Sequence, residues 1–237
     1  MARDMWEFAD GEAALGKDPG AVLDDRVVAC AAELFLREGL EAVKMADIAD
    51  AAGVGVATVY RHFSTKGRLA IAAATLMWER FNAQISELVE SAEFLAQGGL
   101  GRLRALLERY RDAYCLHGDF VAFMDAFDHM VVSQGITGEE LAQYGSHVDS
   151  FYVIFEDAYR LGRMDGSITR EVEFRPFYLA LAHALMGVAQ KMRQGEVIPS
   201  DDFSNGFAEL QCLIDMALWS LSGKAPAEDL QQKGDVV

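Results

Sequence analysis

The sequence predicts an all-α fold, built from helices that are separated by glycine-containing turns. Apolar residues make up 51% of the 237 residues, which is a globular composition. The chain has only four prolines and no runs of alternating Val and Thr, so its pattern favours helices throughout. A chain of this length can form one large domain or two small ones with a sizeable core.

The N-terminal part predicts four helices. An acidic leader over 1–23 is expected to be flexible, and Asp24 and Asp25 are placed to cap a helix over 26–38 that ends at Gly39. Two short helices follow, over 45–52 and 56–63, with Gly53 between them. A longer helix over 69–88 can be capped by Ser64 or Thr65.

The rest of the chain predicts five further helices. Gly98, Gly99 and Gly101 indicate a break, after which helix-length stretches run over 100–118, 120–135 and 139–161. The FYVIF run from Phe151 has strand propensity, but an apolar face at helical spacing favours a helix. Helices over 174–194 and 203–222 close the fold, and 224–237 has the composition of a solvated tail.

The net charge of −16 is unevenly distributed. Residues 24–81 hold seven Lys or Arg against eight Asp or Glu, whereas residues 82–237 hold twelve against twenty-four.

Three distant cysteines without a CxxC pair suit a reducing cytoplasm, where each is most simply a small core residue. The leader lacks the features of a secretory signal, and no apolar run reaches the roughly 18 residues of a membrane span. We therefore expect a cytoplasmic protein without a membrane segment.

The stretch DIADAAGVGVATVYRHFSTKGRL, residues 47–69, has the pattern of a helix-turn-helix. Ala49 is the small residue that a close helix crossing needs, and Gly53 allows the sharp reversal through a left-handed conformation. Ile48, Val54 and Val59 are spaced to anchor both helices to the domain. In such a unit the second helix lies in the DNA major groove.

This stretch resembles the TetR family of transcriptional repressors. The family pattern I-A-x-x-A-G-V, then T-[LV]-Y-x-H-F, then a lysine, is matched by IA at 48–49, AGV at 52–54, TVY at 58–60, HF at 62–63 and Lys66. The resemblance covers about residues 26–81. It implies an N-terminal three-helix helix-turn-helix DNA-binding domain over 24–70 and a larger helical ligand-binding and dimerisation domain over 71–223.

The candidate DNA-binding residues lie in and around the second short helix. Hydroxyl, imidazole and ammonium groups there can donate hydrogen bonds to phosphates, and short side chains can touch base edges. For the histidine, capping of the helix end is the alternative. The sequence departs from the family pattern at Lys44, at Ala46, which replaces a common basic residue, and at Gly55, which replaces a Ser or Thr cap. The candidates are Lys44, Val56, Ala57, Thr58, Tyr60, Arg61, His62 and Lys66.

The last two helices carry the candidate dimer interface. In the helix over 174–194, large apolar residues form one stripe and small residues form another beside it. One explanation is a central helix within a monomer, and the other is a homodimer completed by the helix over 203–222. The resemblance favours the homodimer, because such regulators read paired half-sites. The interface candidates are Ala180, Ala184, Gly187, Phe207, Leu210 and Ile214.

Aromatic residues between these regions predict either a ligand pocket or plain core. The resemblance implies release from DNA when a small molecule fills such a pocket, and an apolar or aromatic effector is favoured. His147 could orient that ligand or lie satisfied at the helix surface. The candidate pocket residues are Phe123, Phe127, Tyr144, His147, Phe151 and Phe155.

No set of residues predicts catalysis, a metal or a cofactor. The five histidines show no HxxxH or HExxH spacing of a metal site, and no GxSxG sequence of a catalytic serine occurs. Glycines 53 and 55 lack the third glycine of a nucleotide-binding loop. The sequence therefore predicts a ligand-responsive DNA-binding transcriptional regulator, a homodimeric repressor of operator DNA that a small molecule releases. The alternative is a helical small-molecule-binding protein or small enzyme with a vestigial helix-turn-helix.

Overall fold

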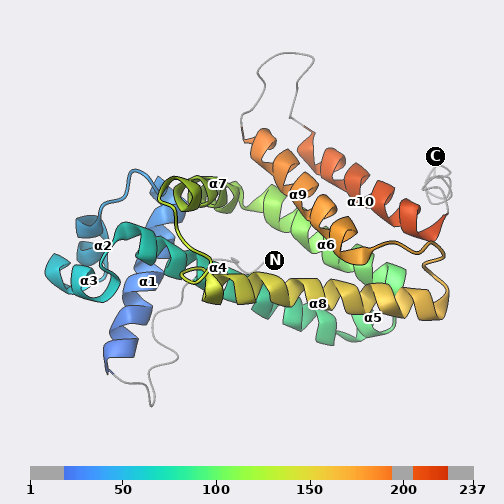
Figure 1. The fold of residues 1–237 in the computed structure, drawn as a ribbon, viewed down its shortest axis with the longest axis horizontal. Coiled ribbons are helices and arrows are strands. Elements are labelled where there is room, and N and C mark those ends of the chain that lie inside the picture. Colours follow the sequence, from blue (N-terminus) through green and yellow to red (C-terminus); the bar gives the residue numbers. More distant parts are fainter. Residues whose placement is uncertain (1–18, 194–204, 224–237) are drawn as a thin grey trace, which may run out of the picture. The chain divides into compact units, whose positions relative to one another are not determined.

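The computed structural model describes residues 19–193 and 205–223, and in these ranges the secondary structure is entirely helical (Figure 1). This confirms the predicted all-α fold. Residues 1–18 of the predicted leader and the whole predicted tail, 224–237, lie outside the described residues. The helices are α1 Pro19–Glu38, α2 Met45–Ala51, α3 Val56–Phe63, α4 Lys66–Glu90, α5 Ala92–Leu95, α6 Gly99–Leu116, α7 Gly118–Ser133, α8 Ala142–Asp165, α9 Phe174–Met192 and α10 Gly206–Ser222.

The chain divides into two compact units. The described part of the first comprises 19–84 and 119–149, and that of the second comprises 85–118, 150–193 and 205–223. The first unit thus holds α1 to α3, most of α4, α7 and the first turns of α8. The predicted boundary between residues 70 and 71 falls inside α4, so the functional division at that point stays a prediction.

Several predicted boundaries were wrong. Helix α4 begins at Lys66 and not at residue 69, and α8 covers Ala142–Asp165 and not 139–161. Helix α1 begins at Pro19, a residue whose fixed φ and missing N–H suit a first helical turn, so Asp24 and Asp25 lie inside the helix and not at its cap. Gly99 and Gly101 belong to α6, while the short helix α5 was not predicted. The FYVIF segment is helical, within α8, as its apolar face indicated.

The core of the first unit holds the short helices α2 and α3 in place. Ile48 and Ala49 from α2 and Val59 from α3 are all at most 1% exposed. Phe35 of α1 stacks on Phe123 of α7 at a ring separation of 5.9 Å. Burial of each large apolar side chain contributes about 1.5–3 kcal/mol, so this core fixes the two short helices, which could not be stable alone.

The second unit is built mainly from α6, α9, α10 and the later part of α8, and it also includes the end of α4 and the short helix α5. Helices α9 and α10 run side by side and both contact α6 (Figure 1). At the start of α6 the backbone of Gly99 approaches that of Gly162 of α8 so closely that Gly99 has no room for a side chain, and a Cβ at Gly162 would overlap the Ile168 side chain. The Gly99 N–H donates to Asp165 Oδ2 at 2.7 Å, so α8 also caps the N-terminus of α6.

Candidate nucleic-acid interface

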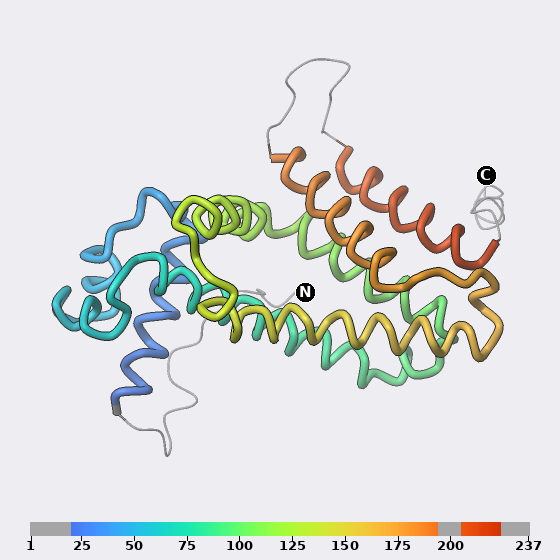
Figure 2. The backbone as a smooth tube through the Cα atoms, viewed as in Figure 1, coloured from blue at the N-terminus to red at the C-terminus, as the bar shows by residue number. Residues whose placement is uncertain are grey.

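The turn between α2 and α3 has the geometry that the sequence predicts. Gly53 has a φ of +64°, which is a left-handed conformation that glycine adopts without steric cost. Its N–H donates to the Asp50 carbonyl at 3.1 Å, and the Val54 N–H donates to the Ala49 carbonyl at 2.9 Å. These two bonds form a Schellman motif, which ends α2 and reverses the chain into α3 (Figure 2).

Helix α3 turns one face inward and one face to solvent. Val59 is buried, and Phe63 and Thr58 are half-buried. The outward side carries Val56, Ala57, Tyr60 and Arg61, which we call the α3 face; Tyr60 is 51% exposed and Val56 43%. The short residues at its N-terminal half permit close approach of another surface, and the longer polar residues follow one turn later. Such a face fits a groove between two rows of phosphates.

The first turns of α2 and α3 are capped differently. The Lys44 N–H donates to Asp47 Oδ2 at 2.8 Å, so a side chain three residues on satisfies this backbone group at the start of α2. The exposed Lys44 side chain leaves its ammonium at the surface. Gly55 precedes α3 with extended backbone, φ −72° and ψ 140°, and supplies no side-chain cap.

A serine at position 55 is expected to stabilise the protein. An added Cβ would meet only Thr58 Oγ1 at 4.0 Å, and the backbone already has the angles of a capping serine. Gly55→Ser should raise the free energy of unfolding by about 0.5–1 kcal/mol, from the cap and from the restricted unfolded chain. Thermal and urea unfolding measure the change.

Gly53→Ala is the opposing control, because Gly53 has a positive φ. This change should destabilise the protein by about 1 kcal/mol. If Gly55→Ser lowers the stability as Gly53→Ala does, the assignment of residue 55 as the α3 cap is wrong.

His62 lies against α1. Its Nδ1 is 2.7 Å from Asp24 Oδ1, which ties the end of α3 to the first turns of α1. The side chain is 24% exposed. The sequence predicted a phosphate contact or a helix-end cap for His62. The structure adds a contact with Asp24 of α1 that no motif indicated.

The corner between α3 and α4 is strained. Ser64 has φ 59° and ψ −47°, and the Thr65 N–H donates to the Phe63 carbonyl at 2.6 Å, which closes a γ-turn of the rare positive-φ type. Thr65 Oγ1 then accepts from the Arg68 N–H at 3.2 Å and caps α4, as predicted. Lys66, the first residue of α4, points its ammonium at the loop between α1 and α2.

The predicted pocket residues are divided between the two units. In the first unit, Phe123 and Phe127 are buried, and Phe127 packs on Tyr144 at 5.2 Å between ring centres. The Tyr144 hydroxyl accepts from Trp78 Nε1 at 3.3 Å, and burial raises the pKa of Tyr144 to about 12. His147 Nε2 lies 3.2 Å from Glu79 Oε1. These four residues thus pack as core or as a helix-to-helix contact within the first unit.

Phe151 and Phe155 belong to the aromatic core of the second unit. Both lie beside Tyr110, with ring centres 5.9 and 5.7 Å away. Of the six predicted residues, Phe155 lines a cavity in the second unit. That cavity is apolar, has a volume of about 10 Å³, and is bounded by side chains of α6, α8, α9 and α10 that include Leu103, Phe174, Tyr178 and Leu218.

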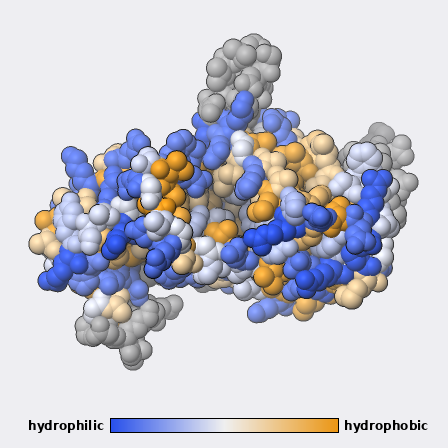
Figure 3. Space-filling view, in the orientation of Figure 1, coloured by the Kyte–Doolittle hydropathy of each residue, from blue (hydrophilic) through white to orange (hydrophobic). Residues whose placement is uncertain are grey.

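The predicted interface residues also separate into two groups. Ala180, Ala184, Gly187 and Phe207 are exposed, whereas Leu210 and Ile214 are fully buried inside the second unit. The last two are therefore core residues of this chain, because α10 turns them toward its neighbours. The exposed side of α10 carries Phe207, Cys212, Met216 and Trp219, and Figure 3 shows hydrophobic residues over the region of α9 and α10.

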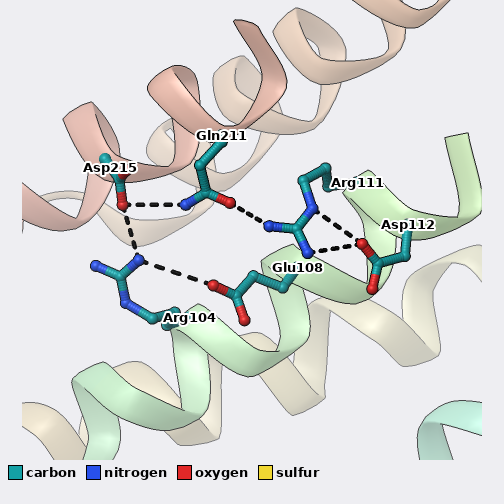
Figure 4. A network of polar contacts seen from close by, with 6 residues as sticks. All are labelled: Arg104, Glu108, Arg111, Asp112, Gln211 and Asp215. Carbon is teal, nitrogen blue, oxygen red and sulfur yellow. Dashed lines mark hydrogen bonds and ion pairs between the residues drawn. The ribbon is translucent and has the colours of Figure 1, made fainter. Parts of the chain in front are cut away.

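A polar network fixes this orientation of α10. Arg104 of α6 lies 2.7 Å from Asp215 of α10, and Arg111 donates to Gln211 (Figure 4). The Arg111 guanidinium also lies over the Phe207 ring, 4.3 Å from its centre. Since the Arg111 side chain is only 13% exposed, its charge is partly desolvated and the contact is stronger than a surface pair.

Two further kinds of site are not found in the part of the chain that the structure describes. No three His, Cys, Asp or Glu side chains gather there as a metal site would require. Nor is any helix within 19–193 or 205–223 both long and apolar enough to cross a bilayer.

The described fold is thus that of an all-helical protein with an N-terminal helix-turn-helix. Residues 27–73 match the family model for bacterial regulatory proteins of the tetR family. Over 88 residues the chain is 35% identical to the HTH-type transcriptional regulator TcmR of Streptomyces glaucescens. The aligned residues make up 37% of this chain and 38% of TcmR. The chain therefore aligns with well under half of that relative's length.

Solved structures share the fold at low sequence identity. FadR from Bacillus subtilis in complex with stearoyl-CoA superposes with a TM-score of 0.59 at 13% identity, over 81% of this chain and 96% of FadR. A TetR transcription regulator from Haloarcula marismortui gives 0.60 at 16%, over 85% and 98%. The ketosteroid regulator KstR2 of Mycobacterium tuberculosis gives 0.58 at 18%, over 85% and 95%.

These findings confirm the resemblance that the helix-turn-helix motif indicated. The match to the tetR family is carried by the helix-turn-helix region over 27–73.

Proposed function

We propose that the protein is a transcriptional regulator whose α3 face enters the major groove of operator DNA. The observation that carries this proposal is the exposure of Val56, Ala57, Tyr60 and Arg61 on a helix whose other side is anchored by buried residues. Tyr60 and Arg61 supply donors for phosphates, and Ala57 and the half-buried Thr58 supply short groups for base edges.

Selection from a pool of random-sequence duplexes tests this function. The protein is expected to retain a discrete consensus and to shift it in a gel at protein concentrations far below those that shift unselected DNA. Retention of no DNA at low salt would favour the alternative, a helical binding protein or small enzyme with a vestigial helix-turn-helix.

The regulator is proposed to act as a homodimer through the exposed sides of α9 and α10. Small residues at 180, 184 and 187 allow a second copy to approach α9 closely, and the apolar Phe207, Met216 and Trp219 stand on α10 beside them. An exposed apolar surface of this kind on two adjacent helices is typical of an interaction site. A dimer would present two α3 helices to paired half-sites.

Sedimentation equilibrium measures this association. The unsubstituted protein should have twice the chain mass of 26.0 kDa, and Trp219→Glu should dissociate it at micromolar concentration because each copy buries a charge. Met164→Glu, a change at a 78% exposed apolar residue of α8, is the control that should leave the mass doubled. A monomer that still binds the selected duplex with full affinity would contradict the homodimer.

The effector is proposed to be a small, largely apolar molecule that enters the second unit. Support comes from the apolar lining of the cavity beside Phe155 and Tyr178 and from the structural relative that holds stearoyl-CoA. A volume of about 10 Å³ holds no more than about one water, so a ligand would have to displace side chains. By favouring a second arrangement of the helices, it would change the separation of the reading helices and release the DNA.

A further inference from the structure

The ammonium of Lys66 is bound by the main chain of its own unit. Lys66 Nζ donates to the Val43 carbonyl at 2.9 Å and to the Glu41 carbonyl at 3.0 Å. Both carbonyls belong to the loop between α1 and α2, more than twenty residues earlier in the chain. The first residue of α4 therefore holds the segment that leads into α2.

We infer that Lys66 is a positioning residue, which sets the orientation of the helix-turn-helix through these two carbonyls and does not bind a DNA phosphate. The part of this inference that concerns DNA binding rests on the proposed function. The contacts between Lys66 and the two carbonyls do not depend on it. It replaces the phosphate contact that the sequence pattern suggested for Lys66.

The segment held by Lys66 is fixed from both sides. The Val43 side chain is buried, and the next residue, Lys44, donates its N–H to Asp47 in the first turn of α2. Because α2 packs on α3, a restraint on residues 41–43 is passed directly to the α3 face. Loss of the restraint would free the start of α2 to move.

The same lysine follows the strained γ-turn at Ser64. A turn of that type costs free energy and persists only where its surroundings determine it. Lys66 lies two residues beyond Ser64, and its side chain anchors the start of α4 to the α1–α2 loop. The two contacts thereby restrain the corner between the end of α3 and the start of α4.

The chemistry of the ammonium also favours the internal role. Two of its three N–H groups donate to carbonyls, and only the remaining one could serve a phosphate without a rearrangement. Burial lowers the pKa of Lys66, and the nearby Glu41 carboxylate opposes that shift in part. Arg61, in contrast, is exposed on the α3 face and suits a phosphate contact.

Lys66→Met tests the inference, because it keeps the apolar stem and removes only the ammonium. We compare it with Arg61→Gln, which removes a cation from the α3 face. Two quantities are measured for each: the thermal midpoint, and the slope of log affinity against log salt on the selected duplex. In a dimer, loss of one phosphate contact per copy should reduce the magnitude of this slope by about 1.8.

A positioning role predicts that Lys66→Met lowers the midpoint by roughly 3–6 °C and weakens DNA binding without a change in slope. Arg61→Gln should leave the midpoint unchanged and reduce the slope. A reduced slope for Lys66→Met, or an unchanged midpoint, would overturn the inference. If the unsubstituted protein binds no DNA, the proposed function fails, while the midpoint and the hydrogen exchange of residues 43–48 still decide whether Lys66 holds the loop.

Discussion

Gly99→Ala is expected to destabilise the protein by about 3 kcal/mol, the largest effect of any single change considered for stability. The new methyl group would overlap the backbone N and Cα of Gly162 and the carbonyl oxygen of Ala158. Backbone atoms cannot rotate away as a side chain can, so α6 and α8 would have to separate and leave poorly packed space between them.

Thermal unfolding measures this effect, with an expected fall of the midpoint by about 6–12 °C. Gly101→Ala is the matched control, since its new Cβ would meet only the Gln97 side chain, at 2.9 Å from the flexible Oε1 and 3.3 Å from Cβ, and no backbone atom. That change should be neutral or stabilising, because alanine favours a helix over glycine by about 0.5–1 kcal/mol. Equal stability of the two variants would contradict the close crossing.

Ala57→Glu is expected to weaken specific DNA binding about 100-fold without loss of stability. Ala57 is exposed in the first turn of α3, where a carboxylate is compatible with the helix dipole. On the α3 face, however, each copy would bring a negative charge and a longer side chain toward the duplex. A total cost of about 3 kcal/mol over two copies corresponds to that loss.

Val132→Glu separates this local effect from the change in net charge. Val132 is an apolar residue of α7 that is 82% exposed, and the substitution adds the same charge outside the α3 face. Charges beyond a Debye length of about 8 Å are largely screened at physiological salt, so affinity should fall by less than about threefold. The affinity of each variant is measured by titration of the selected duplex. Equal losses of affinity for the two variants would mean that the net charge of the protein, and not the position of residue 57, causes the loss.

The sequence was most informative where local geometry depends on local residues. The bounds of α3 were predicted because Gly53 and Gly55 punctuate the chain and Val59 and Phe63 keep helical spacing. The start of α1 and the break assigned to Gly99 and Gly101 were mispredicted for different reasons. Pro19 can begin a helix as well as break one, and glycines that indicate a loop can instead serve a close helix crossing, which depends on a residue more than sixty positions away.

The candidate site was predicted in its composition but not in its internal contacts. The motif identified the face that carries Tyr60 and Arg61, since exposed and buried positions follow from helical period. It could not indicate that Lys66 would bind the carbonyls of residues 41 and 43, because every residue has a carbonyl and only the fold selects two of them. Likewise, Leu210 and Ile214 had the right residue type for an interface but face the core.

The most direct test of the account is a comparison of the duplexes selected by the unsubstituted protein, by Ala57→Asn and by Tyr60→Phe. If α3 reads base edges, Ala57→Asn should select the same paired half-sites with a change at one or two base pairs in each, since asparagine can form two hydrogen bonds to adenine. Tyr60→Phe, which removes only a donor to phosphate, should keep the consensus and bind it more weakly. Identical consensus sequences for all three proteins, each bound with equal affinity, would contradict the placement of α3 in the groove.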